Sequence, residues 1–490
     1  MRDASTTIAP AIALVRPADR AGLPVAPATR RRLVGAALAA GDLATITIVV
    51  GLVQLVGPLV GFPAAEGPLA LWICWTFASV AAHAMFGLDS SAHADPVERL
   101  RRRGFANLCA ATLMIVLIEG GPLAPHAEAA DIVLGTLVAI PLGHYLDGLI
   151  RGLLLRRGLW TAATVLYGSM ASCAALARDL EMRPELGFRP IAVLADGEAH
   201  LAEPGYVAGL PVISSAQADI ASLCIEVALC ASGDLNADKA AWLEKLPLRQ
   251  IFVVHDAAVR QTLNLRTCAM GGLLGLELRC AIHQPRNLRL KRMMDLALAI
   301  PASVLLLPII VMLAFAVMLS GSGPVLYAQQ RIGLNGRVFR VYKFRTMYAD
   351  AEARLAQHLE SDPAARREWE RFFKLQDDPR ILPVIGHFLR RSSLDELPQL
   401  WNILRGDMSI VGPRPFPAYH SECFDPAFQA LRVSVPPGLT GLWQVSDRSD
   451  GDLVAQQRQD SFYIHNWSFW LDLYVLLQTL PAVLSARGAR

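Results

Sequence analysis

The chain has 490 residues, too many for one compact domain, so several structural units are expected. Hydrophobic residues make up 53% of it and charged residues only 18%, which excludes a disordered or collagen-like chain and indicates a membrane protein. The net charge of +3 provides no strong positive field, so no nucleic-acid partner is predicted. The eight cysteines include no C-x-x-C pair, which disfavours disulfide frameworks and zinc sites.

Residues 1–29 are rich in Ala, Pro and Thr and are predicted to be a disordered cytosolic tail. A four-helix transmembrane bundle is predicted for residues 30–157, because four apolar runs follow one another there. Arginines near both ends of the bundle and between its two halves alternate with connections that carry no Lys or Arg, which places both ends in the cytoplasm. A buried soluble core, the alternative, does not explain that alternation. The four runs are Leu33–Leu59, Leu69–Leu88, Phe105–Ile118 and Ile132–Leu149, of which the third is the weakest.

Residues 158–285 alternate short β-rich runs with helical stretches, which predicts a Rossmann-like α/β domain. A dinucleotide fingerprint after the first run requires glycines at 168, 170 and 173, but Met170 and Cys173 occupy two of those positions. Structural use is therefore favoured over cofactor binding, and a regulatory or assembly role is predicted. The runs are Ala163–Tyr167, Pro190–Leu194, Ile225–Ala231 and Gln250–Val254.

The mainly α-helical remainder, residues 286–490, opens with a membrane segment at 291–322 whose part from Leu296 onward is uncharged. A crossing would carry a cluster of downstream cations to the outside, against the positive-inside rule. Pro308 lies near the middle of the segment and permits a sharp bend, so a re-entrant helix is predicted. A spanning helix with a proline kink is the alternative. Near the C-terminus, Trp467 and Trp470 beside an apolar run predict an interfacial helix.

Asp395 and Glu396 form an acidic pair just before an apolar helical face. Pro398 is tolerated only in a first turn, so the helix is expected to begin within a residue or two of Asp395. The pair would then lie at the positive end of the helix dipole. The alternative is a purely structural role, because Ser393-x-x-Glu396 is also a capping box.

Several cations accompany the acids, on stiff or glycine-flanked loops, and such a group suits a diphosphate. One carboxylate would attack phosphorus to form an acyl phosphate, and a carboxylate pair would also hold a divalent metal. Mg²⁺ is the metal predicted, with Asp395 and Glu396 as its ligands. The predicted phosphate-binding residues are Lys343, Arg345, Arg390, Arg414 and Arg448.

From Lys291 onward the chain resembles the bacterial sugar transferase family, the monotopic polyprenyl-phosphate phosphoglycosyl transferases. The resemblance rests on the stretches KRMMDL, QQRIGLNGRVFRVYKFRTM, DDPRILPVIGHFLRRSSLDELPQLWNILRGDMSIVGPRP and PPGLTGLWQVSDR. The bundle and α/β domain ahead of it resemble the long hexose-1-phosphate transferases that start polysaccharide or O-antigen repeat units. The family's proline-kinked re-entrant helix corresponds to the segment around Pro308.

The resemblance implies a ping-pong reaction at the bacterial inner membrane, with the catalytic domain in the cytoplasm. Asp395 would attack the sugar-bearing phosphorus of a UDP-hexose and release UMP, and undecaprenyl phosphate would collect the phosphosugar. Glu396 would assist through the Mg²⁺ site, and homodimerisation is expected. Galactose and glucose are the sugars expected, and no residue discriminates between them. Where the family usually has Arg-Pro-Gly, this chain has Pro436-Pro437-Gly438, so the resemblance implies that the strength or manner of phosphate binding differs there.

Two other functions are compatible with parts of the sequence. A membrane-attached nucleotide-sugar dehydratase or epimerase would use the α/β domain, against which the missing glycines weigh. A non-catalytic scaffold for polysaccharide export would use Asp395 and Glu396 only to cap a helix.

Overall fold

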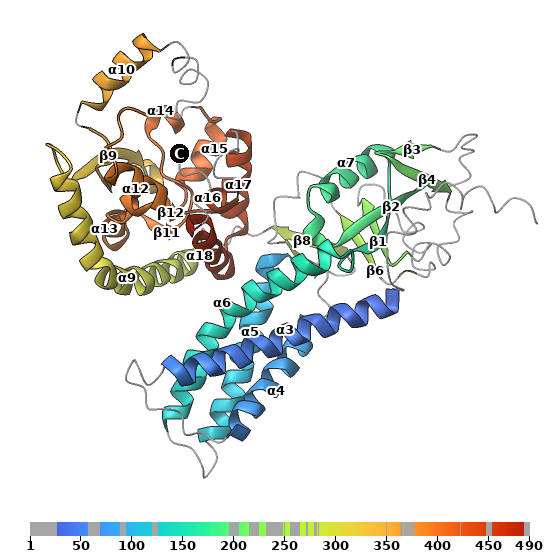
Figure 1. Cartoon of the computed structure of the whole chain (residues 1–490). Coiled ribbons are helices and arrows are strands. Elements are labelled where there is room, and N and C mark those ends of the chain that lie inside the picture. The colour runs from blue at the N-terminus through green and yellow to red at the C-terminus, as the bar shows by residue number, and fades with distance from the viewer. Residues whose placement is uncertain are drawn as a thin grey trace, which may run out of the picture. The chain divides into compact units, whose positions relative to one another are not determined.

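The structure is a computed structural model of the chain, and it forms two compact units, residues 1–260 and 261–490, each described by itself (Figure 1). The residues that it describes are 27–56, 69–88, 95–119, 126–195, 205–214, 225–231, 248, 250–254, 265–270, 273–278, 282, 284–348, 350–362, 366, 375, 378–421, 423–446 and 453–484. Most of the predicted tail, residues 1–26, lies outside them. The first helix begins at Pro27, inside the predicted tail, where proline is well tolerated because a helix start needs no amide hydrogen.

Four helices of the first unit pack side by side: α3 (Pro27–Val56), α4 (Leu69–Met85), α5 (Pro96–Glu119) and α6 (His126–Arg156). Each predicted apolar run lies within or largely within one of them. Trp75 and Met114 are at most 1% exposed in their shared core, whereas Phe77 and Leu137 are more than 60% exposed on the outside. Apolar side chains therefore cover the outside as well as the inside, as expected of helices surrounded by lipid.

Two of these four helices are long and apolar enough to cross a membrane, over Thr29–Val56 and Ala129–Arg156. α4 has only 17 residues, and the first turns of α5 carry Arg101, Arg102 and Arg103. A third candidate, Pro285–Leu319, lies in the second unit. The chain thus has three candidate membrane helices among its described residues.

The α/β part of the first unit is a six-stranded sheet with the order β3-β4-β2-β1-β5-β6. All of its pairs are parallel except β3 with β4, and the order reverses beside β1 as in doubly wound folds. The four predicted strands are confirmed. The bounds are β1 Ala162–Tyr167, β2 Phe188–Ala195, β3 Tyr206–Val207, β4 Leu210–Ser214, β5 Val227–Ala231 and β6 Gln250–Val254.

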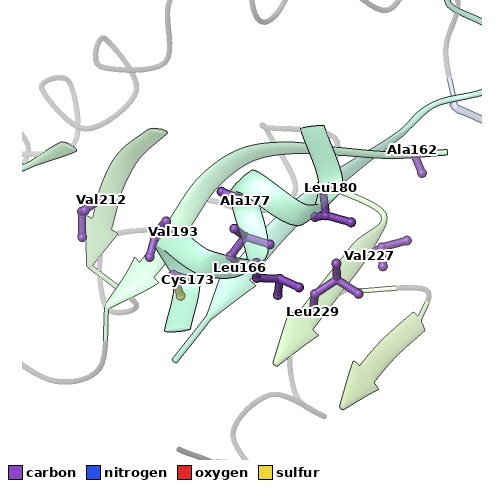
Figure 2. Close-up of a cluster of buried hydrophobic side chains, with 10 residues drawn as sticks. Ala162, Leu166, Cys173, Ala177, Leu180, Val193, Val212, Val227 and Leu229 are labelled. Atoms are coloured by element: carbon purple, nitrogen blue, oxygen red, sulfur yellow. The ribbon is translucent and has the colours of Figure 1, made fainter. Parts of the chain in front are cut away.

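Helix α7 (Met170–Glu181) packs on this sheet through small and branched side chains (Figure 2). Cys173 is 1% exposed in that core, among residues that include Leu166 and Val193. It therefore fills the helix–sheet interface at a position where the dinucleotide fingerprint has a glycine. Ser169 caps α7, because its hydroxyl accepts a hydrogen bond from the Ser172 amide at 3.3 Å.

The second unit begins with an antiparallel hairpin of β7 (Leu265–Met270) and β8 (Leu273–Leu278). A mainly helical domain with two small sheets follows, β9 with β10 and β11 with β12. Its helices are α9 Pro285–Leu319, α10 Ala351–Ser361, α12 Ile385–Ser392, α13 Gln399–Arg405, α14 Ala418–Ser421, α15 Pro426–Val433, α16 Leu442–Ser446, α17 Leu453–Asn466 and α18 Phe469–Leu484. Its strands are β9 Leu326–Ile332, β10 Val338–Phe344, β11 Ser409–Val411 and β12 Gly438–Thr440.

Helix α9 turns sharply between two arms (Figure 1), and Pro301 and Pro308 lie inside it. Ala299 belongs to a core cluster with Val341, and Val317 belongs to one with Phe344, both on β10. A straight helix would separate Ala299 and Val317 by about 27 Å, whereas the two β10 positions lie about 10 Å apart. Both arms therefore pack on neighbouring parts of the same strand, as the proline-dependent bend predicts.

Strands β11 and β12 approach closely at Gly412 and Gly438. The Gly412 amide donates to the Thr440 carbonyl at 2.9 Å, and the Gly438 amide donates to the Pro413 carbonyl at 2.9 Å. A methyl group on Gly438 would collide with the Gly412 backbone, which cannot rotate away. This approach fixes the loop Gly412-Pro413-Arg414-Pro415.

We expect Gly438→Ala to destabilise the second unit by about 3 kcal/mol, because overpacking against backbone forces the two strands apart. Thermal unfolding in detergent measures the change. Gly152→Ala is the matched control, since a methyl group at Gly152 would meet nothing within 4 Å. Equal unfolding temperatures for the two variants would contradict the close approach.

Candidate active site

Asp395 and Glu396 lie in a short 3-10 turn, Leu394–Glu396, between α12 and α13. Ser393 ends α12 in the left-handed conformation with φ of 57°, so the chain reverses direction just before the acids. Its hydroxyl makes no capping hydrogen bond, so the capping box, the alternative role for this segment, does not form. α13 begins only at Gln399, after Pro398, so the acids precede that helix in a turn of their own.

Glu396 is held by two cations from distant parts of the second unit. Its Oε1 accepts from Lys343 Nζ of β10 at 2.6 Å and from Arg414 Nη2 of the 412–415 loop at 3.1 Å. Burial alone would raise the pKa of this carboxyl, but the Arg414 and Lys343 charges and hydrogen bonds outweigh it and lower the pKa to about 2. Glu396 is therefore a fixed negative charge.

Asp395 has a different environment although it is the next residue. Its side chain is 15% exposed, and Lys343 Nζ lies 3.9 Å from its Oδ2, beyond hydrogen-bond reach. It makes no hydrogen bond with any residue that the structure describes. Burial raises the pKa of this carboxyl, and the Lys343 charge only partly offsets the burial. Adjacent acids with pKa values shifted in opposite directions are typical of sites that assign different roles to two carboxyl groups.

The other predicted site residues divide into three groups. Arg390, at the end of α12, lowers the pKa of Asp395 by its charge, and its buried Nη1 has no hydrogen-bond partner in the described part of the chain. Arg345 lies elsewhere: its guanidinium caps α9 by donating to the Val317 carbonyl in the last turn at 3.3 Å, and it also donates to the carbonyls of Gly321 at 2.8 Å and Ser322 at 2.5 Å just after the helix. Arg448 lies outside the described residues. The structure thus brings Lys343, Arg390 and Arg414 to the acid pair.

An ion pair between Arg432 and Asp460, which was not predicted from the sequence, lies against the backbone of the 412–415 loop. Arg432 of α15 donates to the Arg414 carbonyl at 2.6 Å, lies 3.1 Å from Asp460 of α17 and stacks 4.0 Å from the ring of Phe416. Its guanidinium therefore holds the backbone of the residue whose side chain binds Glu396. No local pattern marks Arg432, because its partners are brought together only by the fold.

We expect protein stability to depend on the titration of Asp460. Burial outweighs the Arg432 charge and raises the pKa of this carboxyl from 3.8 to about 6. Between those pH values the folded chain binds a proton that the unfolded chain does not, so the contribution of Asp460 to stability falls as pH rises through about 6. Unfolding temperatures at pH 5 and pH 7 should therefore differ less in Asp460→Asn than in the wild type. An unchanged difference would contradict this assignment.

The donor set of the acid pair fits a magnesium ion that substrate helps to hold. No group of three or more His, Cys, Asp or Glu side chains with metal-ligand geometry occurs in the described residues. Mg²⁺ is commonly bound by one or two carboxylates together with phosphates and water, and the Asp395 carboxylate has no hydrogen bond that such an ion would have to displace. The two acids therefore fit this ion only together with a phosphate ligand.

Fold and site together define a membrane-associated enzyme whose acid pair is surrounded by cations. A family model described as bacterial sugar transferase matches residues 286–486. The chain is 34% identical over 368 residues to the UDP-galactose-lipid carrier transferase of Erwinia amylovora, covering 72% of this chain and 74% of that protein. It has the same identity and coverage with the undecaprenyl-phosphate galactose phosphotransferase of Salmonella typhimurium. It is also 45% identical over 199 residues to the exopolysaccharide production protein ExoY of Sinorhizobium fredii, covering 41% of this chain and 87% of that protein. The chain belongs to the bacterial sugar transferase family.

Proposed function

We propose that the protein transfers hexose-1-phosphate from a UDP-hexose to undecaprenyl phosphate, giving undecaprenyl-diphospho-hexose and UMP, as the first membrane step of surface polysaccharide synthesis. The names of its relatives support this reaction. The main structural support is the difference in hydrogen bonding and ion pairing between the two acids. Glu396 is ion-paired by Lys343 and Arg414, while Asp395 beside it makes no hydrogen bond with a described residue.

In this proposal the Asp395 carboxylate attacks the phosphorus that carries the hexose. An oxygen–phosphorus bond forms, and the bond from that phosphorus to the UMP oxygen breaks, so UMP leaves with the electron pair. An oxygen of undecaprenyl phosphate then attacks the same phosphorus and releases Asp395 as a free carboxylate. Asp395 and Glu396 would hold a Mg²⁺, which when bound supplies positive charge against the phosphate oxygens.

The cations have two tasks in this proposal. Lys343 and Arg414 fix Glu396, and their remaining donors face charge that develops on the transferring phosphoryl group. Arg390 adds positive charge beside Asp395 and keeps an unused buried donor, which suits a phosphate oxygen. We assign no phosphate contact to Arg345, because its guanidinium already donates hydrogen bonds to the backbone carbonyls that follow α9.

We also propose that α9 is re-entrant and that the second unit lies on the cytoplasmic face of the inner membrane, as the catalytic domain that begins at residue 286. Val304, Leu305 and Met312 are more than 60% exposed. Exposure of these apolar side chains to water costs free energy, and contact with lipid removes that cost. Packing of both arms on β10 supports entry and exit on one side. Together with α3, α4, α5 and α6 as a transmembrane bundle, this arrangement keeps a cytosolic nucleotide sugar and a membrane-borne acceptor within reach of one site.

Cysteine labelling tests the orientation of α9. A cysteine introduced at Ser322, just beyond Gly321, should react with a membrane-impermeant maleimide only after the cells are opened. Reaction in intact spheroplasts would show that α9 spans the membrane. A cysteine at Ser361 of α10 in the same unit serves as the matched control.

Release of UMP by purified protein tests the reaction. Incubation with Mg²⁺, polyprenyl phosphate and a panel of UDP-hexoses should yield UMP and a lipid-linked sugar phosphate with one or few sugars, which also identifies the hexose. Absence of UMP with every sugar would contradict the proposal. Homodimerisation remains a prediction that light scattering of the same preparation checks.

A further inference from the structure

Asn402 is a buried polar residue in the middle of α13, the helix that follows the acid pair, and it is 0% exposed. Its side-chain amide makes two hydrogen bonds to strand β10. The oxygen accepts from the Tyr342 amide at 3.2 Å, and the nitrogen donates to the Arg340 carbonyl at 2.7 Å. The same nitrogen lies 3.5 Å from Asp407 Oδ2. The carboxamide therefore finds its partners inside the protein, and two of them belong to one strand.

These two hydrogen bonds lie on one edge of β10. The backbone groups of alternate residues point to the same edge of a strand, so Arg340 and Tyr342 present a carbonyl and an amide side by side. A carboxamide carries one acceptor and one donor group, and Asn402 thus takes the place of a neighbouring strand. Aspartate has the same shape but lacks the donor, and alanine lacks both groups. The residue type is therefore matched to this edge.

The next residue on β10 is Lys343, which reaches the acid pair. Its Nζ lies 2.6 Å from Glu396 Oε1 and 3.9 Å from Asp395 Oδ2. The acids belong to the turn that leads directly into α13. Asn402 therefore ties the segment that carries the acids to the strand that carries the lysine. A slide of β10 by one residue would move Lys343 by about 3.3 Å, which is enough to break its contact with Glu396.

Other contacts hold α13 in place without setting the register of β10. Arg292 of α9 donates to the carbonyls of Ile403 at 2.6 Å and Leu404 at 2.9 Å, which belong to the last turn of α13. Val341 of β10 packs in one core cluster with Leu400 and Ile403. Apolar contact of this kind has no preferred direction, whereas a hydrogen bond joins one particular pair of atoms. The two Asn402 hydrogen bonds therefore specify which part of β10 lies beside α13.

We infer that Asn402 is a positioning residue for sugar-phosphate transfer, because its amide sets the register of β10 on α13 and so holds Lys343 at the acid pair. The inference rests on the proposed function, in which Lys343 faces the transferring phosphoryl group. Asn402 acts through Lys343 and is not itself a catalytic residue.

A double-mutant cycle between Asn402 and Lys343 tests the inference through UMP release in the presence of Mg²⁺ and polyprenyl phosphate. Asn402→Ala should lower kcat per folded molecule about tenfold, since Lys343 is no longer held at the acids. In the Lys343→Met background the same change should lower kcat by less than about twofold, because no ammonium group is left to misplace. Asn402→Asp should repeat the pattern, so the test does not depend on the folding of one variant.

Asn466→Ala is the matched control for a purely structural effect. Asn466 is 4% exposed in α17, and its amide donates to the Phe462 carbonyl of the same helix at 2.8 Å. The control should lower the unfolding temperature and leave kcat per folded molecule unchanged. Hydrogen exchange gives a readout that is independent of turnover. The Tyr342 amide should exchange faster in Asn402→Ala than in either the wild type or Asn466→Ala.

Two results would overturn the inference. An equal loss of kcat on changing Asn402 with and without Lys343 would show that Asn402 does not act through the lysine. Wild-type kcat in both Asn402 variants would show that transfer does not depend on this contact. If the wild type releases no UMP with any UDP-hexose, the proposed function fails and this inference fails with it. Normal wild-type turnover together with an additive cycle contradicts only the role of Asn402.

Discussion

Asp395→Asn is expected to abolish sugar-phosphate transfer, with kcat reduced about a thousandfold or more, because an amide cannot replace a carboxylate that forms the bond to phosphorus. The change keeps the shape of a side chain that makes no hydrogen bond with a described residue, so folding should be unaffected. UMP release and thermal unfolding of the same preparation measure the two quantities. Asp350→Asn, the same substitution at an exposed carboxyl just before α10, is the matched control.

Glu396→Gln separates the roles of the two acids. It leaves Lys343 and Arg414 without their counter-charge, so we expect a smaller loss of kcat than in Asp395→Asn together with reduced stability. Ser393→Ala should retain most activity, since the Ser393 hydroxyl caps no helix. Full turnover by Asp395→Asn would show that Asp395 is not the nucleophile and would remove the basis of the proposed mechanism.

A covalent adduct is the direct readout of the same prediction. Enzyme quenched during turnover with UDP-hexose and without polyprenyl phosphate should gain the mass of one hexose phosphate on a peptide that contains Asp395. The adduct should disappear on addition of the acceptor and should be absent from Asp395→Asn. An active preparation that never shows the adduct would indicate direct transfer between the two substrates.

Much of the fold follows from local sequence patterns. The apolar runs predict α3 and α6 because a helix in lipid needs a long stretch without charges, and that stretch is visible in the sequence. Strands β1 and β5 are equally visible as short β-branched and apolar runs between polar segments. The bend of α9 follows from a proline in an uncharged run whose flanks resist crossing.

The sequence predicts which residues belong to the candidate site better than it predicts how they are arranged. Lys343 and Arg414 are predicted from cation-rich stretches, one now seen on strand β10 and the other in the 412–415 loop, and both do contact Glu396. Arg345 has the same local appearance, yet it caps α9, and only the three-dimensional position of the α9 carbonyls determines this. A backbone carbonyl has no sequence signature. Cations that bind phosphate and cations that cap helices therefore look alike in sequence.

Two further local patterns do not determine where their side chains lie. Ser393 matched a capping box, but its left-handed backbone turns the chain so that Glu396 faces Lys343 instead of the Ser393 amide. Trp467 matched an interfacial aromatic residue, but it is 3% exposed and donates to Asp472 at 3.1 Å inside the second unit. Lys343 is distant in sequence from Glu396, and the Asp472 carboxylate that receives the Trp467 hydrogen bond is itself held inside by the distant Lys291. Local spacing reveals neither of these long-range ion pairs.

The buried pair of Lys291 and Asp472 supports a second large effect. Lys291 Nζ lies 2.7 Å from Asp472 Oδ2, and the two side chains are 2% and 0% exposed. Tyr463 donates to Asp472 Oδ1 at 2.7 Å, and Trp467 donates to Oδ2. The pair joins the first arm of α9 to α18 inside one polar cluster, so it fixes the membrane segment to the domain that carries the acid pair.

Lys291→Met should destabilise the second unit by about 3–5 kcal/mol, because it leaves the Asp472 charge buried without its cation. The double variant Lys291→Met with Asp472→Leu should recover part of that loss, since a buried pair replaced by apolar side chains leaves no charge unpaired. Thermal unfolding in nanodiscs measures both, with Arg289→Met, at an exposed position one half-turn earlier on α9, as the matched control. Should the single variant unfold at the wild-type temperature, the ion pair contributes nothing to the docking of α9, and the first arm of α9 must be held by its apolar contacts with β10 and α13.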